Sequence, residues 1–302
     1  MEIKNRIVAA LALCGIFLQC LSLDSFLFKG EKLGSYRFDS YCAETECPDA
    51  LDSLPPADPA DIRRFSIRSG SDNIAAVILG KKRIFDGSDT IIVYFHGTGP
   101  HIDYYWPRIR LLYNTGYSVL AVDYRGYGVS TGRPTESGIY EDGQSVLRFA
   151  RDSLGNPHIV VYAFSLGSLI GCEVTLKAST DQIFSLVLEA PIASIATLVD
   201  DGSYLDLPAS YVTTYTGNNA ERIRSISIPL LWLHGTKDET LNRESNGLPL
   251  WNNYQGREGY YLAVDGAGHK TVPQTIGYAR YCSIVKDFIA GHAGDNSGLT
   301  RK

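Results

Sequence analysis

The chain has no long run of basic residues, and its 28 Lys and Arg against 33 Asp and Glu give a formal net charge of −5 over 302 residues. Proteins that bind nucleic acids do so mainly through Lys and Arg side chains clustered against phosphates. We therefore expect no nucleic-acid partner. Charged residues make up 20 % and hydrophobic residues 44 % of the chain, a balance typical of a globular protein with a substantial core.

Motifs for bound nucleotides and metals are also missing. Gly97-Thr98-Gly99 and Gly126-Tyr127-Gly128 each begin like the dinucleotide pattern G-x-G-x-x-G, but both lack its third glycine. Pro100, beside the first stretch, has no N–H to offer a phosphate. No nearby Cys or His joins Cys42 and Cys47 to complete a zinc-ligand set. The sequence thus implies neither a metal nor an organic cofactor.

Residues 1–23 differ in character from the rest of the chain. Lys4 and Arg6 precede an apolar, charge-free run, residues 7–23, which is the pattern of an export signal, and cleavage after Ser22 fits it. The run is barely long enough to span a bilayer if it is retained. We therefore expect a signal peptide or a membrane anchor, and a protein that is exported or membrane-associated, in the periplasm, at the cell surface or in a secretory compartment.

Two other interpretations of residues 1–23 fit less well. Lipidation of Cys14 or Cys20 would make an anchor, but Leu13 and Gln19 stand where lipoprotein signals usually have a small residue. A buried N-terminal helix is disfavoured because the run is apolar on all sides.

The two ends of the remaining chain are predicted to be irregular. Residues 24–60 form a prefix that is rich in proline near its end, and residues 293–302 are expected to be a disordered tail. In an exported protein, Cys42 and Cys47 would form a local disulfide; the alternative is two free thiols in a surface loop. Cys172 and Cys282 lie on apolar faces of predicted helices and are interpreted as core residues.

Between these ends, residues 61–292 alternate between strand-like and helix-like stretches. The later strands are continuous apolar runs, typical of parallel strands covered on both faces by helices. This alternation predicts an α/β fold with a mostly parallel, doubly wound sheet. The expected strands are 65–68, 75–79, 91–95, 119–122, 159–164, 185–188, 230–233 and 260–264, and the expected helices are 104–114, 137–153, 166–178 and 272–290. Residues 192–227 show no convincing strand and little helical periodicity, which predicts a short lid.

Ser165 is the first candidate for catalysis, because it lies on the turn between a predicted strand and a predicted helix. Its surroundings, AFSLG, match the pattern G-x-S-x-G except at Ala163. Such a turn lifts the serine Oγ above the sheet and aims the helix N-terminus at it. Alanine adds only a methyl group at the place where strand and helix cross, so we expect the turn to form. The alternative is an ordinary helix N-cap.

A nucleophilic serine needs a base and an acid, and the sequence offers both after later strands. Asp238 follows the strand at 230–233, and His269 follows the strand at 260–264 in the glycine-rich stretch GAGH. The order Ser, Asp, His, with each residue beyond the carboxyl end of a strand, is the chain order of the triad in one particular fold. Asp265, which lies four residues before His269, is the alternative candidate for the acid.

Two further histidines stand in His-Gly pairs after predicted strands. These residues, His96 and His234, are interpreted as residues that organise their loops.

The region from about residue 65 to 292 resembles the α/β-hydrolase superfamily, and most closely the Bem46-like and α/β-hydrolase-domain-containing serine hydrolases. The matching stretches are His96-Gly97, DYRGYGVSTGRPTE at 123–136, AFSLG, HGTKDETL and GAGH. The resemblance implies an α/β-hydrolase domain over 61–292, with Ser165 as nucleophile, Asp238 as acid and His269 as base. It further implies an oxyanion hole made by the backbone N–H groups of Thr98 and Leu166.

We expect a serine hydrolase that cleaves carboxylic esters or thioesters of small to medium acyl groups through an acyl-enzyme. The predicted lid is short, is interrupted by Pro208 and Gly217, and carries three Asp residues, which disfavours a lipase for long-chain triglycerides. A serine peptidase of the same fold and a non-catalytic binding module are the alternatives. The expected partner is a small-molecule ester or thioester, and no protein partner is inferred.

Overall fold

The computed structural model describes residues 24–41, 48–80, 90–155, 158–178, 183–202, 209–293 and 298–302. The predicted signal or anchor, residues 1–23, and the Cys42–Cys47 pair lie outside these ranges. Over the described ranges, we find no helix with the length and apolar character to cross a membrane. Cys172 and Cys282 are free and buried, as expected of core residues.

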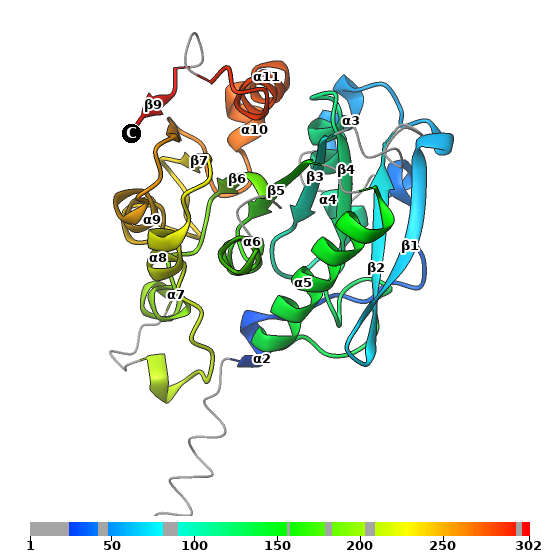
Figure 1. Cartoon of the computed structure of the whole chain (residues 1–302), viewed down its shortest axis with the longest axis horizontal. Helices are drawn as coiled ribbons and strands as arrows, with labels where there is room; N and C mark the ends of the chain where they lie inside the picture. The colour runs from blue at the N-terminus through cyan, green and yellow to red at the C-terminus, as the bar shows by residue number, and fades with distance from the viewer. Residues whose placement is uncertain are drawn as a thin grey trace, which may run out of the picture.

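One sheet runs through the described part of the chain, with the strand order β1-β2-β4-β3-β5-β6-β7-β8-β9 (Figure 1). The neighbours from β4 through β3 to β8 pair in parallel, whereas β1, β2 and β9 join in antiparallel fashion. The strands are β1 (Ile62–Ser69), β2 (Asp72–Leu79), β3 (Thr90–Phe95), β4 (Ser118–Val122), β5 (His158–Phe164), β6 (Ile183–Glu189), β7 (Leu230–Gly235), β8 (Gly259–Val264) and β9 (Thr300–Arg301). Each of the first eight contains one of the predicted strands, most of which were predicted too short, and the predicted fold class is confirmed.

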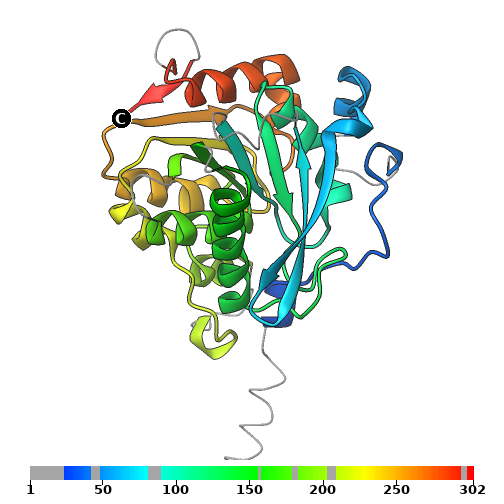
Figure 2. The same ribbon diagram turned by 45° about the vertical axis from the view of Figure 1, so that its right-hand side comes forward.

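Helices cover both faces of the sheet (Figure 2). One face packs against α4 (Ile102–Tyr113), α10 (Val272–Ile276) and α11 (Tyr278–Ile289). The other packs against α5 (Glu136–Ser153), α6 (Gly167–Lys177), α7 (Ile195–Gly202) and α9 (Leu248–Asn253). Because each central strand is buried on both sides, its apolar residues form a continuous run rather than an alternating one.

Three expectations about secondary structure were wrong. The single helix expected at 272–290 is two helices, because Gly277 between them has φ +88°, a conformation that a helix cannot continue through. The tail expected to be disordered includes β9, which pairs with β8. The lid region, expected to have little helical structure, contains α7 and the short α8 (Asn219–Arg222).

The prefix was predicted to be irregular, and its described residues contain four short helical turns. These are α2 (Asp24–Leu27), η1 (Phe38–Ser40), α3 (Pro48–Ser53) and η3 (Pro59–Asp61). The prefix nevertheless packs against the body, since the Phe38 ring is buried 4.6 Å from that of Trp106 in α4.

Candidate active site

Ser165 has a backbone conformation that residues other than glycine rarely adopt. Its φ is +52°, on the two-residue turn between the end of β5 and the start of α6. Such a conformation costs on the order of 1–3 kcal/mol and is usually found where function requires it. Its N–H donates to the carbonyl of Glu189 at the end of β6, at 3.0 Å, which ties the turn to the neighbouring strand.

The small residues around Ser165 allow the helix to lie against the sheet. A Cβ atom on Gly167 would lie 2.1 Å from the carbonyl oxygen of Phe95, so only glycine fits beside the end of β3. A Cβ atom on Gly171 would lie 2.6 Å from the Cβ of Ala163. The extra methyl group of Ala163 is therefore accommodated by the missing side chain at Gly171, one turn into α6. This explains how AFSLG forms the turn without its first glycine.

The structure brings Ser165, His269 and Asp238 into one chain of hydrogen bonds. The Nε2 atom of His269 lies 2.9 Å from the Ser165 Oγ, and its Nδ1 lies 2.8 Å from the Asp238 Oδ2. All three residues are buried to at least nine-tenths of their surface. With Nδ1–H donating to the carboxylate, Nε2 is left as the acceptor for the serine hydroxyl, which is the arrangement a general base requires.

Asp238 is held as a carboxylate by its surroundings. Burial by itself raises the pKa of this carboxyl, but hydrogen bonds from His234 and His269 outweigh that effect and hold the pKa well below its usual range. The backbone N–H groups of Thr240 and Leu241 also donate to its Oδ1, at 2.9 and 2.7 Å. Asp238 therefore stays ionised at neutral pH, the state in which a carboxylate can stabilise a protonated imidazole. Asp265, the competing acid, is exposed and accepts a hydrogen bond from the Thr236 hydroxyl.

His234 contributes to the site in a way that the sequence analysis did not foresee. Its Nδ1 accepts from the Trp232 indole N–H at 3.3 Å, which leaves Nε2 as the protonated nitrogen. That nitrogen lies 2.9 Å from the carbonyl oxygen of Leu241 and 3.2 Å from the Asp238 Oδ2. The four-residue spacing between His234 and Asp238 was the available signal, but only the turn after β7 shows that the side chains meet. These contacts agree with the interpretation of His234 as a residue that organises its loop. That loop carries Asp238, the predicted acid.

Replacing His234 with Phe should lower kcat for an ester about tenfold, because Asp238 loses one of the side chains that hold its carboxylate. The variant should also be less stable by about 1–3 kcal/mol, because the buried carbonyl of Leu241 and the buried indole N–H of Trp232 lose their hydrogen-bond partner. Ester hydrolysis and urea unfolding measure the two effects. His158→Phe is the matched control, since His158 is exposed at the opposite end of β5 and stacks on Phe184. Equal kcat values in the two variants would contradict a role for His234.

A buried ion pair lies behind the histidine. Arg108 in α4 and Glu189 are both fully buried, with Nη1 and Oε2 2.5 Å apart. The Arg108 guanidinium also lies 4.4 Å from the centre of the Phe164 ring, and that ring lies 5.2 Å from the His269 ring. The ion pair thus supports the Phe164 ring, which lies against the His269 imidazole. A glutamate at the end of the apolar strand IFSLVLE was the sequence signal for it.

The two residues predicted to form the oxyanion hole lie on segments that meet. Leu166 is buried and precedes α6, where the first N–H groups of a helix have no acceptor within the helix. Thr98 lies on the loop after β3, and its carbonyl accepts from the Tyr105 hydroxyl at 3.3 Å. Gly167 connects the two segments through its close approach to Phe95. Catalytic use of the two N–H groups stays a prediction.

His96 anchors the loop that carries Thr98. Its Nε2 lies 3.1 Å from the Asp123 Oδ1, and its Nδ1 lies 2.7 Å from the carbonyl oxygen of Gly97. Asp123 also accepts from the backbone N–H of Ile102 at the start of α4. These contacts agree with the interpretation of His96 as a residue that organises its loop.

Comparison with known proteins identifies relatives of the chain. A family model described as alpha/beta hydrolase fold matches residues 90–207. The chain is 32% identical to protein bem46 of Schizosaccharomyces pombe over 157 residues, which cover 49% of this chain and 51% of that protein. It is 30% identical to human protein ABHD12B over 170 residues, which cover 51% of this chain and 47% of that protein. It is also 30% identical to the uncharacterized protein YfhR of Escherichia coli over 164 residues, which cover 52% of this chain and 55% of that protein. The matches span about half the length of these curated relatives.

Solved structures show the same fold over a larger share of the chain. The esterase Pf2001 of Pyrococcus furiosus superposes with a TM-score of 0.62 at 20% identity, covering 79% of this chain and 94% of that one. A cold-adapted esterase from an Arctic intertidal metagenomic library superposes with a TM-score of 0.56 at 18% identity, covering 75% and 93%. The sequence matches and the observed strand order agree on the α/β-hydrolase fold, and the chain is similar to Bem46 and to the α/β-hydrolase-domain-containing proteins.

Proposed function

We propose that this protein is a serine hydrolase that cleaves carboxylic esters or thioesters through an acyl-enzyme. The proposal rests above all on the hydrogen-bonded chain Ser165–His269–Asp238, which begins at a serine with φ +52°. A strained, buried serine linked to a histidine and an ionised carboxylate has the parts of a catalytic triad. An ordinary N-cap serine has no need of these partners.

In the proposed reaction, the Ser165 Oγ attacks the carbonyl carbon of the substrate while the His269 Nε2 takes the hydroxyl proton. Asp238 stabilises the resulting imidazolium. The backbone N–H groups of Thr98 and Leu166 stabilise the oxyanion, with each donor contributing roughly 3 kcal/mol. His269 then protonates the departing alcohol or thiol. A water molecule, activated by the same imidazole, releases the acid and restores the serine.

The predicted lid, residues 192–227, which we call the cap, favours small to medium acyl groups as substrates. Within its described residues, 192–202 and 209–227, the cap consists of α7, α8 and short 3-10 turns, and Ser194 pairs with Asn218 at its base. Tyr211 is 59 % exposed, and its hydroxyl-bearing ring suits a wetted mouth rather than a dry lipid-binding surface. The two solved structures compared above are esterases, which agrees with this substrate class.

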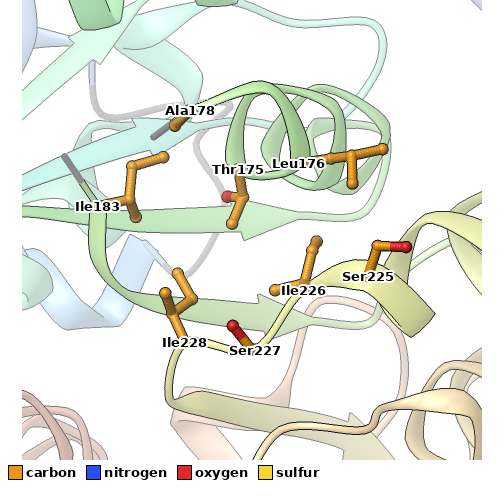
Figure 3. A pocket seen from close by; sticks show the side chains of 8 residues that line it. All are labelled: Thr175, Leu176, Ala178, Ile183, Ser225, Ile226, Ser227 and Ile228. Carbon is orange, nitrogen blue, oxygen red and sulfur yellow. The ribbon is translucent and has the colours of Figure 1, made fainter. Parts of the chain in front are cut away.

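A small pocket elsewhere in the fold is unsuited to hold the acyl group. It has a volume of about 70 Å³ and is lined by Thr175, Leu176, Ala178, Ile183 and residues 225–228 (Figure 3). Ile183 begins β6, whereas Ser165 follows the end of the adjacent parallel strand β5. A strand of this length spans roughly 20 Å, so the pocket lies at the opposite edge of the sheet.

A series of p-nitrophenyl esters of increasing chain length tests the substrate class. We expect the largest kcat/KM between acetate and octanoate, because a short cap with polar residues offers little apolar surface to a long chain. A steady rise to palmitate, with activation at a lipid interface, would overturn this expectation.

Labelling with a fluorophosphonate probe tests the activity itself, because only an activated serine reacts. Labelling of the wild type that disappears in Ser165→Ala is the expected result. A wild type that is not labelled and hydrolyses no ester, thioester or peptide would favour the binding module instead. Hydrolysis of peptides in preference to esters would favour the peptidase.

A further inference from the structure

The prefix residues 24–33, which we call the strap, run along the carboxyl edge of the sheet and contact the loops that surround Ser165. The strap begins at α2, which lies beside the cap at the lower edge of the fold (Figure 1). The family resemblance of the sequence begins after this segment, at about residue 65. Its contacts are with segments that are 60 to 190 residues away along the chain.

The first end of the strap holds the cap. The Asp24 carboxylate accepts hydrogen bonds from the Thr213 hydroxyl at 2.6 Å, the Thr214 N–H at 3.0 Å and the Thr214 hydroxyl at 2.6 Å. Four residues later the buried Phe28 ring packs 4.7 Å from the ring of Tyr215. One carboxylate and one aromatic ring thus fix three consecutive cap residues.

The middle of the strap holds the loop that carries the proposed oxyanion donor. The Thr98 hydroxyl donates to the carbonyl of Leu27 at 3.3 Å, and the N–H of Glu31 donates to the carbonyl of Gly99 at 2.8 Å. These two bonds lie on either side of the peptide that joins Thr98 to Gly99. Movement of the strap is therefore coupled to that peptide.

The far end of the strap is fixed to the body. The Gly128 N–H donates to the carbonyl of Glu31 at 2.7 Å, and the N–H of Leu33 donates back to the Gly128 carbonyl at 2.9 Å. A Cβ atom on Gly30 would lie 2.6 Å from the carbonyl oxygen of Gly126, so the strap lies close against this loop. The loop after β4 serves as the fixed point from which the strap reaches the cap.

We propose that the strap forms one wall of the active-site mouth and that Asp24 is a specificity-determining residue. Through the strap, Asp24 ties cap residues 213–215 to the Thr98–Gly99 loop, and this limits the size of the acyl group that the site accepts. This proposal rests on the proposed serine hydrolase function. A carboxylate that accepts three hydrogen bonds holds the cap more firmly than neutral contacts of the same number, since bonds to ionised acceptors are the stronger ones. Without it, the cap separates from the strap and the mouth widens.

The test compares Asp24→Ala with wild type in the full chain. For Asp24→Ala we expect the ratio of kcat/KM for p-nitrophenyl benzoate to that for the acetate to rise at least fivefold over wild type. Asp24→Asn keeps an acceptor oxygen and should give an intermediate ratio. Asp58→Ala is the matched control, because Asp58 lies in the same prefix and its side chain accepts a local hydrogen bond from the N–H of Ala60.

Hydrogen exchange provides a readout that does not depend on activity. The amides of residues 209–217 should exchange at least tenfold faster in Asp24→Ala than in wild type or Asp58→Ala. An unchanged exchange rate there, or a fall in acetate and benzoate hydrolysis by the same factor, would overturn the proposal. If the wild type hydrolyses no substrate, the proposed function fails. A faster amide exchange in Asp24→Ala would then show only that Asp24 is a structural residue, which also contradicts the proposal.

Discussion

Ser165→Ala is expected to lower kcat for an ester by roughly 10⁴- to 10⁶-fold, since the nucleophile of a triad cannot be replaced by the remaining groups. The hydroxyl bonds to His269 at 2.9 Å, while the backbone N–H, which ties the turn to Glu189, is kept in the variant. The free energy of unfolding should therefore change little. A purified Ala variant that kept a tenth of the wild-type activity would show that Ser165 is not the nucleophile.

Ser165→Gly separates catalysis from backbone strain. Glycine adopts φ +52° without the steric cost that a Cβ atom imposes, so this variant should be as inactive as Ser165→Ala but more stable by about 1 kcal/mol. Urea unfolding of the three proteins measures the difference. The wild type would then carry a conformational cost that only its activity explains. A Gly variant less stable than the Ala variant would contradict this account of the turn.

Asp238→Asn is expected to lower kcat by roughly 10⁴-fold, because an amide cannot hold the imidazole in the required tautomer or stabilise its charge. Asp265→Asn is the control and should change kcat less than threefold, since Asp265 is exposed and bonds to Thr236. Ester hydrolysis by the two variants at neutral pH gives the ranking. The reverse ranking would overturn the assignment of the acid.

The low pKa of Asp238 also predicts how the free energy of unfolding depends on pH, and comparison of wild type with Asp238→Asn tests it. The pKa of Asp238 is lower in the folded protein than its ordinary value, so its ionised form stabilises the fold at neutral pH. That contribution is lost as the pH falls below about 4, the usual range for an unfolded aspartate, toward the lower pKa of the folded state. The gap in unfolding free energy between wild type and Asp238→Asn should therefore narrow on acidification.

Much of the framework could be predicted from the sequence because it depends on local patterns. Eight strands were recognisable as apolar runs, and the triad residues each follow the carboxyl end of one of them. In a parallel sheet these ends meet at one edge, so chain order was enough to place Ser165, Asp238 and His269 together. The roles of these residues await the experiments above.

The errors in secondary structure have local causes that the pattern did not reveal. The apolar periodicity at 272–290 continues across Gly277, and only its left-handed φ shows that the helix ends and restarts there. Thr300 and Arg301 have no apolar pattern of their own. They form a strand because the edge of β8 offers unpaired backbone groups to a chain end that passes beside it.

The sequence by itself determined the α/β fold, the turn at Ser165 and the order of the three triad residues, because strand burial and turn chemistry are read over a few neighbouring positions. Only the tertiary structure decided what supports that site. Gly171 makes room for Ala163, His234 binds the acid, the Arg108–Glu189 pair lies behind the imidazole, and Asp24 holds a cap segment 190 residues away. The last two are contacts between segments far apart in the chain, and although Glu189 stands out in its apolar strand, nothing near it in the sequence identifies Arg108 as its partner. Their meeting follows from how helices, loops and prefix pack on the finished sheet, which no local pattern encodes.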